Sequence, residues 1–144
     1  MIRHVVAAAL LALTAGAAQA GLPRGCDPNR QITAAQQDRL LRFTAVVRQA
    51  LAESGTPAAL ISRSGTDLSR FGLRYSHAGI ALAAGLDAPW AVRQLYYACE
   101  EGAPRLFDQG LAGFISGSDD ANVGYVSVLL LPPEAAAPLA AAAV

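Results

Sequence analysis

Histidine and cysteine are the side chains of this chain best able to carry acid–base or nucleophilic chemistry near neutral pH. The sequence holds two histidines, His4 near its start and His77, and two cysteines, Cys26 and Cys99. Any general base in the body of the protein would therefore be His77. If His77 activates a cysteine as a general base, Cys99 would be the nucleophile. The alternative for His77 is a half-buried structural histidine that hydrogen-bonds to the backbone.

The first twenty residues have the order of a secretory signal peptide. Met1–His4 is basic, residues 5–17 are apolar, and Ala18–Ala20 has the small-x-small pattern of a cleavage site. The apolar run of about 13 residues is shorter than the roughly 20 that a membrane-spanning helix needs. We therefore expect cleavage before Gly21, a periplasmic or secreted mature protein and no stable membrane span after cleavage. An uncleaved anchor helix is the alternative.

If the protein is exported, the two cysteines enter an oxidising compartment. Two cysteines that are far apart in sequence are there first a candidate disulfide and only second a source of a reactive thiol. A bridge between Cys26 and Cys99 would close a loop of about 73 residues, which the chain-entropy account values at roughly 4 kcal/mol. We expect this disulfide. A free Cys99 nucleophile and unpaired or intermolecular cysteines are the alternatives.

Composition narrows the class of protein. Residues 21–133 are enough for one domain and too few for two, and an Ala-rich tail follows over residues 134–144. The sequence has no lysine and no basic run, and its formal net charge is zero, so nothing predicts nucleic acid as a partner. The histidines and cysteines lack metal-binding spacing, and we expect neither a metal nor a cofactor.

Hydrophobic periodicity predicts one long helix near the start of the mature chain. Thr33 and Gln36 fit a capping box, and Gly55 and Pro57 end the pattern. The apolar residues at three- and four-residue spacing are Leu40, Phe43, Val47, Ala50 and Leu51. We expect this stripe to pack on a sheet.

The rest of the chain favours strands. The predicted strands are Ala58–Arg63, Arg74–Ala83, Trp90–Tyr97 and Tyr125–Leu131. A hairpin joins the second and third, and Pro104 is expected to open a short helix that holds Leu106, Phe107 and Leu111. The Ala-rich end is expected to form at most a frayed helix with little shape to pack. The predicted fold class is α+β, with an N-terminal helix packed on a small, largely antiparallel sheet.

Several of these segments together resemble one bacterial family. The segments are Cys26-Asp27, Gly65-x-Asp67-Leu68-Ser69, Leu73-Arg74-Tyr75-Ser76-His77-Ala78-Gly79, Trp90-x-Val92, Cys99, and Leu106-Phe107-Asp108-x-Gly110-Leu111-x-x-Phe114. In joint spacing, over about residues 24–133, they resemble the family called domain of unknown function 2145. The resemblance implies an exported location and a shared fold, and it implies no established activity.

A more distant similarity is to the permuted NlpC-type papain-like fold, in which a strand reading Tyr-Ser-His-x-Gly-Ile follows a first strand and a loop. That similarity implies that His77 is the base and that a polar group on the next strand orients it. Gln94 would be that group, and Ser69 and Tyr96 are the other candidates. Relatives place the nucleophilic cysteine later, at a helix N-terminus, and continue beyond the last strand, so the resemblance implies a truncated version of the fold.

Two functions follow from these observations. The first is an exported, non-catalytic or binding protein of the periplasm, a component of the cell envelope stapled by Cys26 and Cys99. The alternative is a papain-like cysteine hydrolase or amidase, in which His77 and Cys99 are catalytic.

Overall fold

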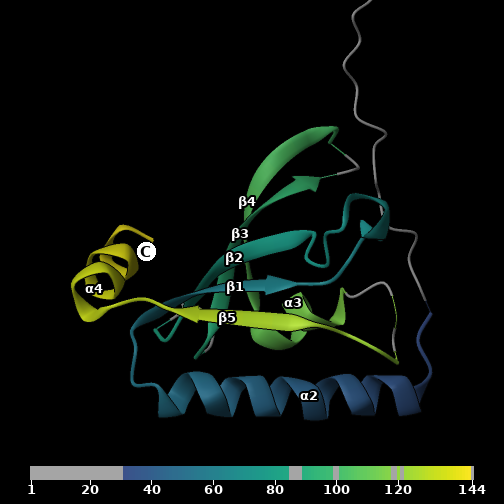
Figure 1. Cartoon of the computed structure of the whole chain (residues 1–144), viewed down its shortest axis with the longest axis horizontal. Helices are drawn as coiled ribbons and strands as arrows, with labels where there is room; N and C mark the ends of the chain where they lie inside the picture. The colour runs from purple at the N-terminus through teal and green to yellow at the C-terminus, as the bar shows by residue number, and fades with distance from the viewer. Residues whose placement is uncertain (1–30, 85–88, 99–100, 118–119, 121, 144) are drawn as a thin grey trace, which may run out of the picture.

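The structure is a computed structural model, and it describes residues 31–84, 89–98, 101–117, 120 and 122–143 (Figure 1). The elements in chain order are α2 (Ala34–Glu53), β1 (Ala58–Arg63), a 3₁₀ turn η1 (Ser69–Phe71), β2 (His77–Leu82), β3 (Ala91–Ala98), β4 (Ala103–Gly110), α3 (Leu111–Ser116), β5 (Val126–Leu130) and α4 (Pro133–Ala142). The expected α+β class, with a helix packed on an antiparallel sheet, is confirmed. The predicted signal peptide lies outside the described residues.

Helix α2 begins where its capping box predicts. The Thr33 hydroxyl accepts from the Gln36 backbone N–H at 3.3 Å, and the Gln36 side chain accepts from the Thr33 backbone N–H at 2.9 Å. The two bonds satisfy donors that the first helical turn leaves free. Helix α2 ends at Glu53, and Gly55 follows with a φ of +64°, a conformation that glycine adopts without strain.

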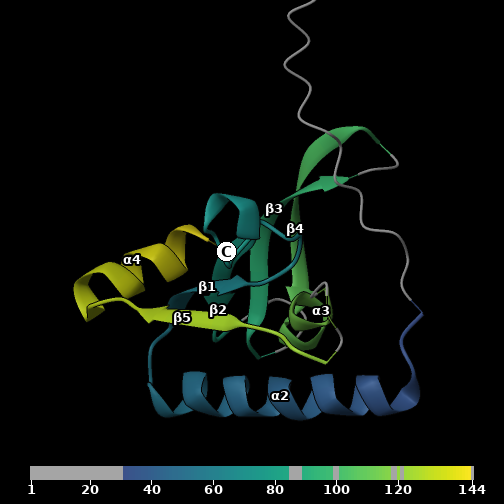
Figure 2. The ribbon, with the colours of Figure 1, turned by 45° about the vertical axis from the view of Figure 1, so that its right-hand side comes forward.

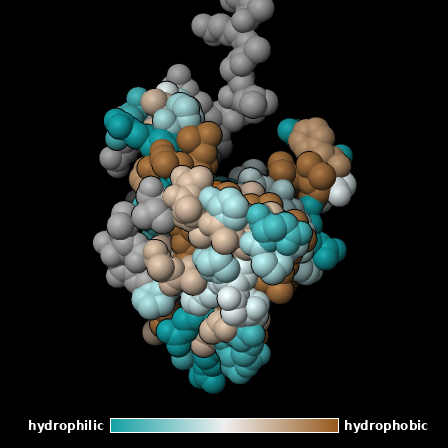
Figure 3. Space-filling model, turned by 90° about the vertical axis from the view of Figure 1, so that its left-hand side faces the viewer, coloured by the Kyte–Doolittle hydropathy of each residue, from teal (hydrophilic) through white to brown (hydrophobic). Residues whose placement is uncertain are grey.

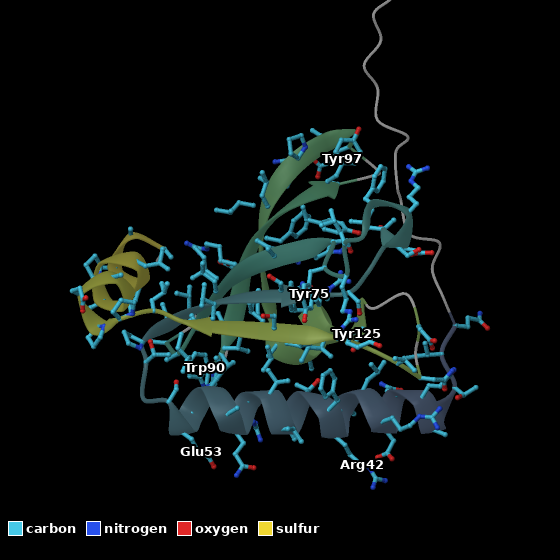
Figure 4. The ribbon with its side chains drawn as sticks, in the orientation of Figure 1. Arg42, Glu53, Tyr75, Trp90, Tyr97 and Tyr125 are labelled. Atoms are coloured by element: carbon cyan, nitrogen blue, oxygen red, sulfur yellow. The ribbon has the colours of Figure 1, made fainter. Side chains whose placement is uncertain are left out.

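The buried side of α2 differs from the predicted stripe at one position. Ala50 is exposed, and Thr44 is buried instead. The Thr44 hydroxyl donates to the Leu40 carbonyl oxygen at 2.8 Å, so its burial leaves no unpaired donor. Outward-facing Arg42 and Glu53 point away from the sheet (Figure 4).

The sheet has the strand order β4-β3-β2-β1-β5, and every neighbouring pair is antiparallel. Strand β1 has the predicted bounds, and β2, β3 and β5 fall on the other three predicted strands. The hairpin expected between the second and third strands is confirmed as the β2–β3 pair.

The predicted helix after Pro104 is wrong. Residues Ala103–Gly110 form strand β4, which pairs with all eight residues of β3, and the helix α3 begins only at Leu111. A turn at Gly102, whose φ is +67°, brings β4 back along β3. The backbone hydrogen bonds of this long hairpin outweigh the weak helical preference of a segment bounded by Pro104 and Gly110.

One face of the sheet packs against α2 and α3. Alternate residues such as Ile61 and Val92 are fully buried there, together with Phe114 and Ile115 from α3. Trp90, just before β3, is also buried, and Figure 4 shows it between the sheet and α2. Burial of a side chain as large as Phe114 contributes about 2–3 kcal/mol, so this face holds the main core.

The opposite face of the sheet carries α4 at one end, and the view in Figure 2 shows α4 and α2 as separate layers. The Ala-rich segment thus forms a ten-residue helix that packs on the sheet, contrary to the expectation that it has little shape to pack. Leu139 and Ala143 contact Ala58 and Leu82. Among the described helices, none combines the length and the apolar character that a membrane span needs.

Candidate functional site

His77 opens strand β2 and is half-buried on the core-side face of the sheet. The Ser76 hydroxyl lies 2.9 Å from the imidazole Nδ1, at hydrogen-bond distance. Because Ser76 is the adjacent residue, the backbone itself sets this contact. The pairing fixes the orientation of the ring, which is the role that the sequence assigned to Gln94, Ser69 or Tyr96.

An aromatic side chain from the next strand lies over the imidazole. The ring centroids of His77 and Tyr96 are 5.8 Å apart and their planes differ by 25°. On its other side, Tyr96 meets the Phe107 ring edge to face at 5.9 Å and 86°. Three rings from β2, β3 and β4 therefore form a continuous row, a geometry that aromatic pairs favour. Tyr96 positions the imidazole by stacking.

Arg63 is the neighbour of His77 that sequence reasoning missed. The two residues are directly paired in the β1–β2 register, and Arg63 is only 3% exposed. Its guanidinium donates to the backbone oxygens of Ser64, at 3.1 Å, and of Gly117, and lies over the Phe114 ring. The sequence does contain a pattern that predicts its burial, because Arg63 follows Ala59 and Ile61 at every second residue and therefore lies on the same face of β1.

Two glycines make room for these buried side chains. A Cβ at Gly65 would lie 2.4 Å from the His77 Nδ1 and 2.7 Å from the Arg63 Nη1. A Cβ at Gly117 would lie 2.5 Å from the Arg63 Nη2. All three distances are far inside van der Waals contact, so any larger residue would displace His77 or Arg63.

The other predicted site residues have different surroundings. Gln94 is buried on the same face as His77, two residues before Tyr96 on β3, and it is paired with Phe107 of β4. Ser69 lies in the 3₁₀ turn, where its backbone N–H donates to Asp67 at 2.9 Å. Hydrogen bonds from the Ser69 backbone and side chain lower the pKa of the Asp67 carboxyl. Ser69 thus completes a local turn.

Cys26 and Cys99 both lie outside the described residues. Their predicted disulfide, and the predicted pairing of Cys99 with His77, therefore stay predictions. Strand β3 is described as far as Ala98, which is two residues beyond Tyr96 and pairs with Ala103. Because a strand rises about 3.3 Å per residue, Ala98 lies some 6–7 Å along β3 from Tyr96.

No group of three or more metal-binding side chains occurs within the described part of the chain.

A second feature, absent from the sequence analysis, is an apolar groove on the opposite face of the sheet. Its volume is about 650 Å³, and it lies between the strands and α4. Its apolar walls include Leu60, Ile80, Leu95, Leu106, Leu129 and Leu139. Figure 3 looks onto the end of the molecule that carries α4, where apolar side chains gather above the hydrophilic surface of α2.

Arg93, which lines the groove, forms an ion pair with Asp108. Arg93 of β3 donates from its Nε to Asp108 of β4 at 2.6 Å, and its Nη2 makes a second bond to the same carboxylate. The hydrogen bond from Arg93 holds the pKa of Asp108 below its usual value. The Arg93 Nη1 also donates to the Ala143 carbonyl oxygen, which links the end of α4 to the sheet. The guanidinium charge beside the groove is therefore paired, and most of the other side chains that line the groove are apolar.

Comparisons with known proteins agree with the family resemblance. A family model described as "Uncharacterized protein conserved in bacteria (DUF2145)" matches residues 50–144. No curated protein and no solved structure matches the chain, so the papain-like similarity is not shown. The match begins after Cys26-Asp27, and it includes all five strands, His77, Cys99 and the groove. Since it covers well over half of the sequence, the chain belongs to the bacterial family DUF2145.

Proposed function

We propose that this protein is an exported, non-catalytic binding protein of the cell envelope, and that its ligand is an amphiphile whose acyl chain occupies the groove beside α4. The observation that carries the proposal is the groove itself. A volume of about 650 Å³ lies within the range of small-molecule sites, which are mostly apolar with a few polar groups.

The side chains that form the groove are unusually exposed for their type. Leu95 is 71% exposed and Leu106 is 65% exposed, although they stand side by side in the β3–β4 register. Leu60 and Leu129, paired in the β1–β5 register, are 38% and 57% exposed. A contiguous exposed apolar surface of this kind marks a binding site more often than a solvated face.

The polar groups of the groove favour a ligand with a plain hydrocarbon chain. The Arg93 guanidinium already donates to Asp108 and to a backbone oxygen, so it offers little unpaired charge. Ser62 and Ser127 are the small polar side chains on the floor. A chain of methylene groups would gain about 0.8 kcal/mol for each group removed from water, while its polar head stays in solvent.

The surroundings of His77 support a structural role for that residue. The Ser76 hydroxyl lies at hydrogen-bond distance from one ring nitrogen, and Tyr96 stacks on the ring. Gly65 lies so close to the ring that a Cβ at position 65 would clash with it. The competing hydrolase hypothesis needs a Cys99 thiolate at the imidazole. The predicted disulfide to Cys26 would remove that thiol.

Displacement of a fluorescent fatty acid tests the proposal. Dansyl-undecanoic acid should bind the purified protein and be displaced by dodecanoic acid. Leu95→Gln and Leu106→Gln should each weaken binding about tenfold, the equivalent of roughly 1.4 kcal/mol of lost apolar contact. Val46→Gln is the matched control, because Val46 is 64% exposed on α2, away from the groove.

Two further variants separate binding from catalysis. His77→Ala and Cys99→Ser should each leave fatty-acid binding within about twofold of the wild type, because His77 does not line the groove and a non-catalytic binding site needs no thiol nucleophile. Absence of displaceable binding by the wild-type protein would overturn the proposal. Equal losses for Leu95→Gln and Val46→Gln would overturn its assignment to the groove.

A further inference from the structure

The two edge strands of the sheet differ in how their outer backbone groups are protected. Strand β4 forms one edge and β5 forms the other. An edge strand exposes a row of backbone N–H and C=O groups that another strand can pair with, and proteins commonly block such rows with proline or charge. The hydrogen bonds of each edge show which residues face outward.

On β5, the outward groups belong to three apolar residues. The Ser64 backbone N–H donates to the Tyr125 carbonyl oxygen at 2.9 Å, so this pair bonds across the β1–β5 ladder. Antiparallel pairs alternate between bonded and non-bonded positions, so Ser127 also bonds toward β1. Val126, Val128 and Leu130 then direct their backbone N–H and C=O groups away from β1.

On β4, the corresponding row is interrupted by a proline and by a charged residue. The Leu111 N–H donates to the Trp90 carbonyl oxygen at 3.2 Å, which fixes the alternation along the β3–β4 pair. Pro104 and Asp108 therefore occupy outward positions. Pro104 has no N–H to offer, and Asp108 carries a charge that pairs with Arg93. Strand β5 contains neither a proline nor a charged residue between Val126 and Leu130.

We propose that the outer edge of β5 pairs with β5 of a second copy of this chain, antiparallel, about a two-fold axis at Val128. In that register Val128 faces Val128 of the second copy, and Val126 faces Leu130. Symmetry makes the Val126–Leu130 pair occur twice, so there are three pairs in all. Each pair exchanges two N–H···O bonds, because all of the outward groups lie at bonded positions. The result is a sheet continuous across both copies.

The second copy is favoured because the edge is complementary to itself. A two-fold axis places every outward donor opposite an outward acceptor, and the side chains of the bonded pairs, Val128 with Val128 and Val126 with Leu130, are all apolar. The chain has a formal net charge of zero, so long-range repulsion does not oppose association. Leu130, which is 52% exposed, lies at the seam and loses solvent contact when it forms.

Proline at position 128 provides a selective test. It removes an outward N–H and leaves the β1–β5 bonds in place, and proline is tolerated at such edge positions. Val128→Ala is the matched control, because it loses similar packing and keeps the N–H. Leu130→Lys is a second variant, at a half-exposed position, that places like charges at the seam.

Sedimentation and amide hydrogen exchange should be measured from micromolar to millimolar protein. We expect a concentration-dependent dimer whose formation slows exchange at Val126, Val128 and Leu130. Val128→Pro and Leu130→Lys should each weaken dimerisation at least tenfold, and Val128→Ala less than about threefold. A monomer at all concentrations, or a dimer that leaves these three amides unprotected, would overturn the proposal. None of the three lines the groove, so this result is independent of fatty-acid binding.

Discussion

The imidazole of His77 and the phenol ring of Tyr96 lie stacked across the β2–β3 pair, with their centroids 5.8 Å apart and their planes 25° from parallel. The stack joins His77 to Phe107 through Tyr96, so the row extends over three strands. A histidine held in this way is packed as part of the sheet.

Removal of the Tyr96 ring should therefore destabilise the fold. Tyr96→Ala should lower the free energy of unfolding by about 1–3 kcal/mol, because two aromatic contacts and part of the buried area are lost. Tyr96→Phe keeps both ring contacts and should stay within about 0.5 kcal/mol of the wild type. Urea denaturation measures both values. Equal effects for the two variants would contradict the stacking role.

Arg63 should matter more for stability than any exposed arginine. Arg63→Ala should cost about 2–4 kcal/mol, because it leaves the Gly117 carbonyl without its donor and empties the space over Phe114. Arg48→Ala, at an exposed position on α2, is the control and should change stability by less than about 0.5 kcal/mol. Chemical denaturation of both variants provides the comparison. A loss for Arg63→Ala no larger than the control's would show that the buried guanidinium is dispensable.

The Arg93–Asp108 pair predicts a pH dependence. The pKa of Asp108 is lowered in the folded state, so the carboxylate stabilises the fold above its unfolded pKa, and this contribution disappears as pH falls through the folded value. Asp108→Asn should lower the midpoint of thermal unfolding at neutral pH, and the difference from the wild type should shrink below about pH 4.

Asp38→Asn is the control for that measurement. Asp38 and Arg42 form an i,i+4 pair on α2 with side chains that are 56% and 79% exposed, compared with 28% and 18% for Asp108 and Arg93. Solvent screening weakens the more exposed pair. The two variants should therefore differ clearly at neutral pH. A constant offset of Asp108→Asn at every pH would count against the ion pair.

The predicted disulfide has its own measurement. Alkylation of the exported, unreduced protein should modify neither Cys26 nor Cys99, and Cys99→Ser should lower the free energy of unfolding by roughly 2–5 kcal/mol. Mass spectrometry after alkylation counts the free thiols. Two reactive thiols in the native protein would exclude the bridge and would leave Cys99 free to act as a nucleophile.

The sequence predicted those elements whose local signals agree with their tertiary contacts. The capping box at Thr33 and Gln36 placed the start of α2, and the alternating run Ala58–Arg63 had its bounds predicted correctly. Strand β4 could not be predicted in this way. Its apolar residues are few, and its pairing with β3 depends on a hairpin that local propensity around Pro104 does not indicate.

The candidate sites show the same limit. His77 stood out by its type, but its contacts with Tyr96 and Arg63 arise from strand register, which a single sequence does not specify. The groove was missed because its leucines come from different strands and α4 closes one end of it. The local sequence of α4 is almost entirely alanine and proline, and its packing depends on Leu139 and the small residues beside it.

Methyl NMR with selective labelling of leucine and valine tests the central claim most directly. Titration with dodecanoic acid below its micelle concentration should shift the methyl signals of Leu95, Leu106 and Leu129, while Val46 on α2 stays unchanged. This outcome would place the acyl chain on the face of the sheet beside α4. Shifts confined to other methyl groups, or uniform small shifts across both faces, would contradict the account.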